Sequence, residues 1–163
     1  RSLIQEAIPR SQPQSYFARI TGGLGVGLSY ALGVKLAMPD RPVFALVGDR
    51  AFHYNAVPSC LGVAEEYGLP IHVVVFNNGR YLSMETSLIK YFPDGAAKNT
   101  GVHYGAAIGP RPDYQYYGKA HGGYGYRVSE PSEIKPAIEK ALKHEAERKL
   151  TVIDVVLSDF NPR

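Results

Sequence analysis

The amino-acid sequence predicts an α/β domain with three layers, in which a mostly parallel, doubly wound sheet lies between two layers of helices. Short apolar runs rich in β-branched residues alternate along the chain with segments of helical pattern. This alternation is typical of parallel strands, which form continuous apolar runs because neither face of the sheet meets water. A chain of 163 residues is also long enough to bury a core of its own.

Composition and charge exclude several classes of function. The 18 basic and 15 acidic side chains leave a net charge of only +3 without a basic stripe, so we expect no nucleic-acid partner. The single cysteine, Cys60, rules out an internal disulfide and a cysteine-based zinc site. No apolar run approaches the roughly 18 residues that span a bilayer, and no secretory signal pattern is present. We therefore expect no membrane partner and a cytoplasmic location. Because the chain begins with Arg1 rather than methionine, we expect a processed chain or a piece of a longer protein.

The N-terminal half of the sequence predicts alternating strands and helices. Prolines and polar side chains indicate that residues 1–15 are a linker, followed by a domain that comprises residues 16–163. The predicted elements are a short strand at 16–20, a glycine-rich loop and buried helix within 21–38, a turn at 39–42, a strand at 43–47, a helix at 55–67 and a strand at 71–76. We expect Asn55 to cap the second helix and Gly68 to end it. Glycine inside a helix costs roughly 1 kcal/mol, so the glycines of the loop and first helix should reflect close packing or the approach of a ligand.

The C-terminal half continues the same pattern. Its predicted elements are a helix at 81–91, an irregular loop at 93–112, a helix at 113–121, a strand at 126–128, an amphipathic helix around 134–142 and a strand at 151–157. The amphipathic helix is predicted from apolar residues spaced i, i+3, i+4, i+7 and i+8, namely Ile134, Ala137, Ile138, Ala141 and Leu142.

Polar residues follow two of the predicted buried strands. Gly48-Asp49 follows the strand at 43–47, and Asn77-Asn78-Gly79 follows the strand at 71–76. Taken singly, these are a helix cap and a turn, but ligands of parallel sheets bind beyond the carboxyl ends of the strands, where both segments fall. A carboxylate, an amide oxygen and a main-chain carbonyl form a set of hard oxygen ligands that suits Mg²⁺ bound together with a phosphate. The sequence therefore predicts a ligand site at this edge of the sheet.

This arrangement resembles the diphosphate-binding motif of thiamine-diphosphate enzymes, in which Gly-Asp, a helix and a strand ending in Asn-Asn occur in this order. Residues 22–28, 35–43 and 117–125 are also similar to the branch that contains benzoylformate decarboxylase and acetolactate synthase. The resemblance extends over roughly residues 15–157 and implies the C-terminal, diphosphate-binding domain of such an enzyme, with thiamine diphosphate and Mg²⁺ as cofactors.

The resemblance also implies roles for individual residues. Asp49, the side chain of Asn78 and the main-chain carbonyl of Arg80 would hold the metal. The carbonyl of Gly22 would accept a hydrogen bond from the cofactor amine, and Leu24 would be the apolar wedge that bends the cofactor. The full set of implied cofactor-binding residues is Gly22, Gly23, Leu24, Gly48, Asp49, Arg50, Ala51, Asn78, Arg80 and Tyr81.

No residue is assigned as catalytic, and three residues are candidates. Residues 82–85 would face the substrate in this branch, which makes Met84 and Glu85 candidate pocket residues. For Glu85 the competing interpretation is a solvated charge on a helix. His53 lies just past the motif and is placed where it could approach the active site.

The family usually has glycine where this chain has Arg50. Arginine would clash if the position requires a positive φ, or it could pair with phosphate oxygens. Because the rest of the motif is intact, we favour obstruction, with cofactor binding retained but weakened. A degenerate, non-catalytic domain of the same fold is the alternative.

The remaining expectations concern completeness and chemistry. The glutamate that activates the cofactor belongs in this family to a pyrimidine-binding domain, usually of a neighbouring subunit, and no segment of this sequence matches that domain. We therefore expect a partner domain or subunit, a homo- or hetero-oligomer, and an inactive chain in isolation. The complete enzyme would be a lyase or transferase that decarboxylates or ligates 2-oxo acids. A nicotinamide-binding Rossmann domain is a further alternative, because Gly23-x-Gly25-x-Gly27 precedes a helix and Asp49 follows some twenty residues later.

Overall fold

The sheet is parallel throughout its four described strands, which lie in the order β1-β2-β4-β3. The computed structural model describes residues 2–8, 11–18, 23–107 and 109–158. The strands are β1 (Val43–Gly48), β2 (Ile71–Asn77), β3 (Tyr124–Val128) and β4 (Thr151–Val156). Each predicted strand from residue 43 onward is confirmed, with bounds that differ by at most two residues.

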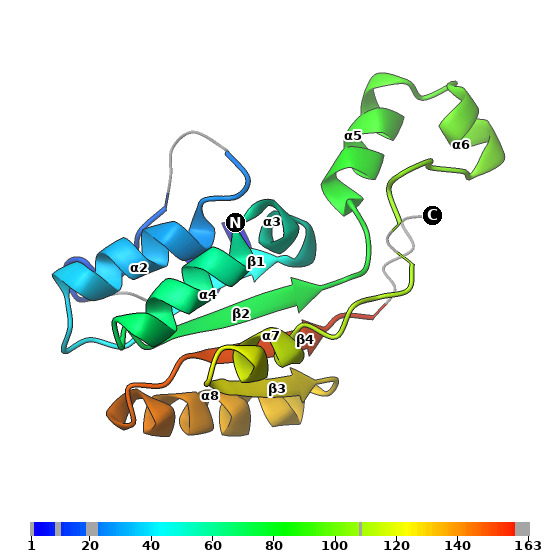
Figure 1. Ribbon diagram of the computed structural model, residues 1–163. Helices are drawn as coiled ribbons and strands as arrows, with labels where there is room; N and C mark the ends of the chain where they lie inside the picture. The colour runs from blue at the N-terminus through cyan, green and yellow to red at the C-terminus, as the bar shows by residue number, and fades with distance from the viewer. Residues whose placement is uncertain (1, 9–10, 19–22, 108, 159–163) are drawn as a thin grey trace.

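Helices cover both faces of the sheet, which confirms the predicted α/β class (Figure 1). The helices are α1 (Ser2–Ala7), α2 (Gly27–Ala37), α3 (Asp49–Tyr54), α4 (Val57–Glu66), α5 (Leu82–Tyr91), α6 (Ala96–Thr100), α7 (Gln115–Ala120) and α8 (Pro131–Ala146). In Figure 1, α2, α4 and α7 lie on one face and α8 on the other, whereas α5 and α6 extend beyond the carboxyl end of β2. None of the helices in the described ranges is long and apolar enough to cross a membrane.

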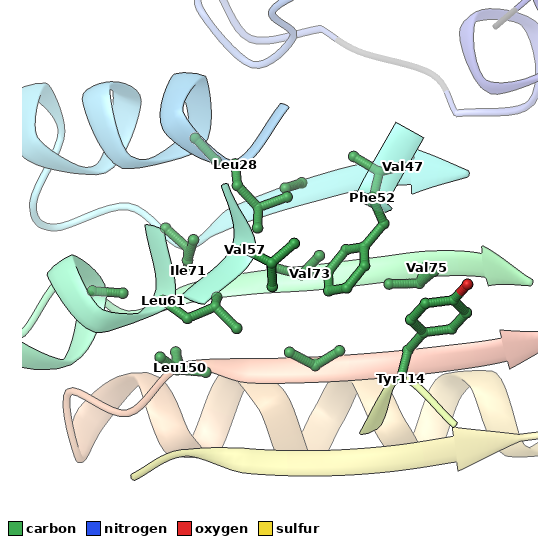
Figure 2. Close-up of a cluster of buried hydrophobic side chains, with 14 residues drawn as sticks. Leu28, Val47, Phe52, Val57, Leu61, Ile71, Val73, Val75, Tyr114 and Leu150 are labelled. Carbon is green, nitrogen blue, oxygen red and sulfur yellow. The ribbon is translucent and has the colours of Figure 1, made fainter. Parts of the chain in front are cut away.

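Two apolar clusters form the core because side chains of a strand alternate between the faces of the sheet. Figure 2 shows the larger cluster, in which Val73 and Val75 of β2 face Phe52, Leu61 and the helices α2 to α4. The intervening Val74 faces the smaller cluster under α8. The smaller cluster comprises Val74, Val128, Ala137, Ala141, Ile153 and Val155. The continuous apolar runs in the sequence thus correspond to strands buried on both faces.

The predicted helix at 55–67 is wrong at its N-terminal end, since the chain forms α3 and α4 with a break at residues 55 and 56. Asn55 does not cap the second helix. Its Oδ1 accepts a hydrogen bond from the Leu28 N–H at 3.0 Å, and its Nδ2 donates to the Ala51 carbonyl at 2.6 Å. The side chain therefore fastens the end of α3 to the start of α2. Gly68 ends α4 as predicted, with a φ of +56°.

Other expectations need smaller corrections. Within the predicted linker at 1–15, residues Ser2–Ala7 form α1, and the loop at 93–112 contains α6. The face of α8 that packs on the sheet is buried at the small side chains Ala137 and Ala141. Ile134 and Leu142, which were expected on the same apolar face, lie at its margins and are 40% and 43% exposed. The expected strand at 16–20 has no regular structure at 16–18, and its last two residues lie outside the described ranges.

Close packing explains the glycine of the loop before α2. Gly25 has a φ of +85°, and a Cβ there would lie 2.3 Å from the Tyr54 carbonyl oxygen. A side chain at this position would therefore separate the loop from the end of α3.

Candidate functional site

The two polar segments singled out in the sequence meet beyond the carboxyl ends of β1 and β2. These strands are neighbours, and Gly48 pairs with Phe76 in their parallel register. Asp49 begins α3 and is only 3% exposed. Its Oδ2 accepts a hydrogen bond from the Gly79 N–H at 2.7 Å, and its Oδ1 accepts one from the Arg50 N–H at 2.8 Å. The carboxylate thus joins the end of one strand to the loop after the next.

The two asparagines at the end of β2 have different surroundings. The buried Asn77 Nδ2 donates to Asp154 Oδ1 at 2.9 Å and to the Pro112 carbonyl at 3.1 Å, so this side chain fastens the strand end to β4. The Asn78 Oδ1 accepts a hydrogen bond from the Arg80 N–H at 3.0 Å. Asn78 therefore belongs to the same short loop as Gly79 and Arg80, which the Asp49 carboxylate also contacts.

The donor set fits Mg²⁺ bound together with a diphosphate. The described residues hold no group of three or more histidine, cysteine, aspartate or glutamate side chains, so a metal here would depend on the single carboxylate of Asp49 and on neutral oxygens. Mg²⁺ accepts such a set because phosphate oxygens and water complete its shell. The space beside the motif is also open, since a Cβ on Gly48 would meet nothing within 4 Å.

Arg50 lies inside this site and is 6% exposed. Its Nη2 donates to the carbonyls of Gly79 at 2.9 Å and Ala106 at 3.2 Å, and its guanidinium carbon lies 4.2 Å from the centre of the Tyr81 ring. The backbone does not require glycine at this position, because the only non-glycine residues with positive φ in the described ranges are Gln14 and Arg148.

A pocket of about 600 Å³ adjoins the motif between α5, α6 and the loop at 102–106. Met84 and Glu85 both line it, together with Tyr81. The pocket wall consists of Tyr54, Tyr81, Met84, Glu85, Leu88, Ala96, Ala97, Thr100, Val102, His103, Tyr104, Gly105 and Ala106. Most of this wall is apolar, so it suits an apolar group better than a charged one.

Glu85 is not a solvated helix charge, and that interpretation is wrong. The side chain is 3% exposed and binds Arg80 through two contacts, Nε to Oε1 at 3.0 Å and Nη2 to Oε2 at 2.6 Å. A buried carboxylate requires such a partner because its desolvation is costly. The pair also fixes Arg80, whose main-chain carbonyl is a predicted metal ligand.

His53 belongs to α3 and is not among the residues that line the pocket. Its Nε2 lies 2.7 Å from the hydroxyl of the buried Tyr114. Burial and the positive charge of Arg50 lower the pKa of His53, while Asp49 opposes the shift. Burial raises the pKa of Tyr114, so its hydroxyl keeps its proton and can donate to the imidazole.

The other predicted cofactor-binding residues lie around the same edge. Gly23 and Leu24 precede α2, and Leu24 is 54% exposed, which leaves this apolar side chain free to contact a ligand. Ala51 is partly buried against the larger core cluster. Gly22 lies outside the described residues.

One buried acid was missed by the sequence reasoning. Asp154 of β4 is fully buried, and its Oδ2 accepts a hydrogen bond from the Tyr114 N–H at 3.2 Å, in addition to its Oδ1 contact with Asn77. Burial raises its pKa, although these hydrogen bonds and Arg127 oppose the shift. An acid within the apolar run Thr151–Val156 was the available signal, because a strand buried on both faces excludes an unpartnered charge.

Comparison with known proteins agrees with this geometry. Residues 2–155 match the family described as thiamine pyrophosphate enzyme, C-terminal TPP binding domain. The chain is 33% identical over 136 residues to the acetolactate synthase isozyme 3 large subunit of Escherichia coli (83% of this chain, 22% of the relative). It is 30% identical over 164 residues to 2-hydroxyacyl-CoA lyase of Arabidopsis thaliana (98% of this chain, 26% of the relative).

Solved structures give the same result. Benzoylformate decarboxylase from Polynucleobacter necessarius superposes with a TM-score of 0.74 at 25% identity, over 98% of this chain and 28% of that one. The thiamine diphosphate-dependent 4-hydroxybenzoylformate decarboxylase of Rhodococcus jostii gives a TM-score of 0.68 at 28% identity, over 84% of this chain and 24% of that one. The chain thus spans about a quarter of the length of these relatives. The family match excludes the nicotinamide-binding alternative, and the protein belongs to the thiamine pyrophosphate enzymes, of which it represents the C-terminal cofactor-binding domain.

Proposed function

We propose that this chain binds thiamine diphosphate through Mg²⁺ as part of an enzyme that decarboxylates or ligates 2-oxo acids. The observation that carries the proposal is the convergence of Asp49 with the loop at 77–81, linked by the 2.7 Å hydrogen bond from Gly79 to Asp49. When bound, thiamine diphosphate supplies carbanion-stabilising chemistry that protein side chains lack. The chain's own residues then have the tasks of holding, orienting and shielding the cofactor.

Each task has a candidate residue. Asp49, Asn78 Oδ1 and the carbonyl of Arg80 would hold the metal, and main-chain hydrogen bonds already orient the first two. Leu24 would pack against the cofactor, because its exposed apolar side chain lies on the loop before α2. Preorganised ligands reduce the entropy lost when metal and diphosphate bind.

The substrate would enter the pocket beside the motif. Tyr81 and Met84 offer it apolar surface, while Glu85 is held by Arg80 and leaves the wall without a free negative charge. Such a wall would not repel the carboxylate of a 2-oxo acid, and it has room for an apolar substituent. Decarboxylation and carboligation both fit these features.

A complete site would need residues from outside this chain. The resemblance assigns cofactor activation to a glutamate of a pyrimidine-binding domain, carried by the same polypeptide or by a partner subunit. The relatives are about four times as long as the matched region, which supports this arrangement. We therefore propose an oligomeric enzyme, and we expect no turnover of 2-oxo acids by the 163 residues alone.

The test is calorimetric titration of thiamine diphosphate with Mg²⁺ into the complete enzyme. Asp49→Asn keeps the shape of the side chain but removes the only carboxylate of the proposed metal site. Affinity should fall at least tenfold, about 1.4 kcal/mol. Asp40→Asn is the matched control, because Asp40 is exposed in the turn before β1, at the opposite edge of the sheet. Unchanged affinity in Asp49→Asn would remove Asp49 from the site, and absence of Mg²⁺-dependent binding to the unaltered enzyme would favour the non-catalytic alternative.

A further inference from the structure

Arg50 carries buried N–H groups that the described part of the chain leaves without acceptors. Its Nη2 is satisfied by the carbonyls of Gly79 and Ala106, but neither Nε nor Nη1 has a hydrogen-bond partner. A buried donor without a partner costs about 1–3 kcal/mol, and more when the group is charged. The contacts that hold the Arg50 guanidinium are two neutral carbonyls and a ring, and none of them is an ion pair with a carboxylate.

The position of the guanidinium identifies the kind of ligand that would satisfy it. Arg50 begins in the first half of the motif, directly after Asp49, and its side chain crosses to the second half, over Tyr81 and beside Gly79. These are the two segments between which a diphosphate would lie. A diphosphate offers several anionic oxygens, and arginine pairs with such oxygens more strongly than with neutral acceptors.

We propose that Arg50 supplies part of the positive charge that neutralises the cofactor diphosphate, and that its Nε and Nη1, which are shielded from solvent in this structure, become uncovered and donate to the diphosphate when it binds. The inference rests on the proposed function, because it takes the same ligand in the same site. It also reverses the expectation of obstruction from the sequence: Arg50 lies in ordinary helical backbone, and its Nη2 contacts hold the guanidinium against the Tyr81 ring. Glycine, the residue usual in the family, has no side chain that could make these contacts.

Shared neutralisation has a consequence for the metal. Arg50 and Mg²⁺ are like charges near one anion, so each reduces what the other contributes to binding. With Arg50 present, inorganic diphosphate should still bind measurably when Mg²⁺ is removed. With glycine at this position, binding should depend on Mg²⁺ more steeply.

The test is calorimetry of the complete enzyme with inorganic diphosphate and, separately, thiamine diphosphate, each with Mg²⁺ and with a chelator. Arg50→Gly should weaken both ligands about 10- to 100-fold, the range expected for losing charge-assisted hydrogen bonds. The loss should be larger without Mg²⁺ and smaller at high salt, because salt screens the contact. Arg50→Lys, which keeps the charge but has one nitrogen, should recover part of the affinity and serves if the glycine variant does not fold.

Arg148→Gln is the matched control. Arg148 also donates to a main-chain carbonyl, that of Gly68, but it is exposed and far from the motif, so the variant should bind both ligands as the unaltered enzyme does. Tighter binding by Arg50→Gly would show obstruction and overturn the inference. A loss that is equal with and without Mg²⁺ and insensitive to salt would show that Arg50 only ties two loops together, which also overturns it. Absence of thiamine diphosphate binding to the unaltered enzyme would instead contradict the proposed function.

Discussion

Replacing Lys35 with methionine should destabilise the fold through a polar network at the edge of the sheet opposite the site. The Lys35 side chain is 3% exposed, and its ammonium donates to the carbonyls of Pro39 at 2.8 Å and Arg41 at 2.9 Å, and to Oε1 of Glu145. The second Glu145 oxygen lies 2.8 Å from Nε2 of His72. The network therefore links α2, on one face of the sheet, to α8, on the other, around the amino ends of the strands.

The expected loss is about 3 kcal/mol in the free energy of unfolding. Removing one partner of a buried ion pair typically costs about 3–5 kcal/mol, and the low end applies because the Glu145 side chain is 21% exposed and regains some hydration. For a chain of this size such a loss lowers the melting temperature by about 6–12 °C. Chemical and thermal unfolding followed by circular dichroism would measure both quantities.

The matched control is Lys143→Met, an exposed lysine of α8, which should change stability by less than about 0.5 kcal/mol. A double-mutant cycle with Glu145→Gln would separate the ion pair from the two carbonyl contacts. A loss below about 1 kcal/mol for Lys35→Met would refute the reasoning, since it would mean that the buried groups find other partners.

Two further predictions concern His72 and a pair of glycines, Gly125 of β3 and Gly62 of α4. Burial lowers the pKa of His72 below its ordinary value of 6.5, although Glu145 opposes the shift, so the unfolded chain binds the proton more readily than the folded one. The stability that neutral His72 contributes should be present above about pH 6.5 and should be lost as the pH falls below that value. The free energy of unfolding of the His72→Gln variant should therefore change less with pH in this acidic range. Gly125→Ala should destabilise the fold by at least about 2 kcal/mol, because the added Cβ would lie 2.0 Å from the Gln115 carbonyl oxygen. Gly62→Ala in α4, where a Cβ meets nothing within 4 Å, should leave stability unchanged or raise it by up to about 1 kcal/mol, and urea unfolding would compare the two. Equal stability of the two alanine variants would contradict the packing argument.

The sequence alone was sufficient for the four strands of the described sheet and for placing the two polar segments at the same edge of it. A strand such as Ile71–Asn77, buried on both faces, must be apolar at nearly every position, so its composition identifies it without knowledge of its neighbours. Polar residues that follow such a strand lie at the carboxyl edge of the sheet, because all strands of a parallel sheet end at the same edge. Asp49 and the loop at 77–81 could therefore be placed at one edge of the sheet before their contacts were known.

Only the tertiary structure decided how individual polar side chains are used. Asn77 and Asn78 are adjacent and chemically identical, yet Asn77 is buried against Asp154 and Asn78 shares a loop with Arg80. Lys35 and Glu145 are 110 positions apart, and the sequence around each of them indicates only an exposed charge on a helix. Whether a polar side chain is buried and paired depends on which partners the fold brings within hydrogen-bond distance. Local sequence patterns carry no information about partners that are distant along the chain.

Arg50 illustrates the same division. The sequence identified it as an arginine at a position where the motif that the chain resembles usually has glycine, and two opposite consequences were considered. The fold determined that the backbone there is ordinary helix and that the guanidinium lies over Tyr81, with two nitrogens that find no partner among the described residues. Burial without an acceptor arises only when elements distant in sequence pack together, which is why the sequence could locate this residue but the tertiary structure was needed to suggest what it binds.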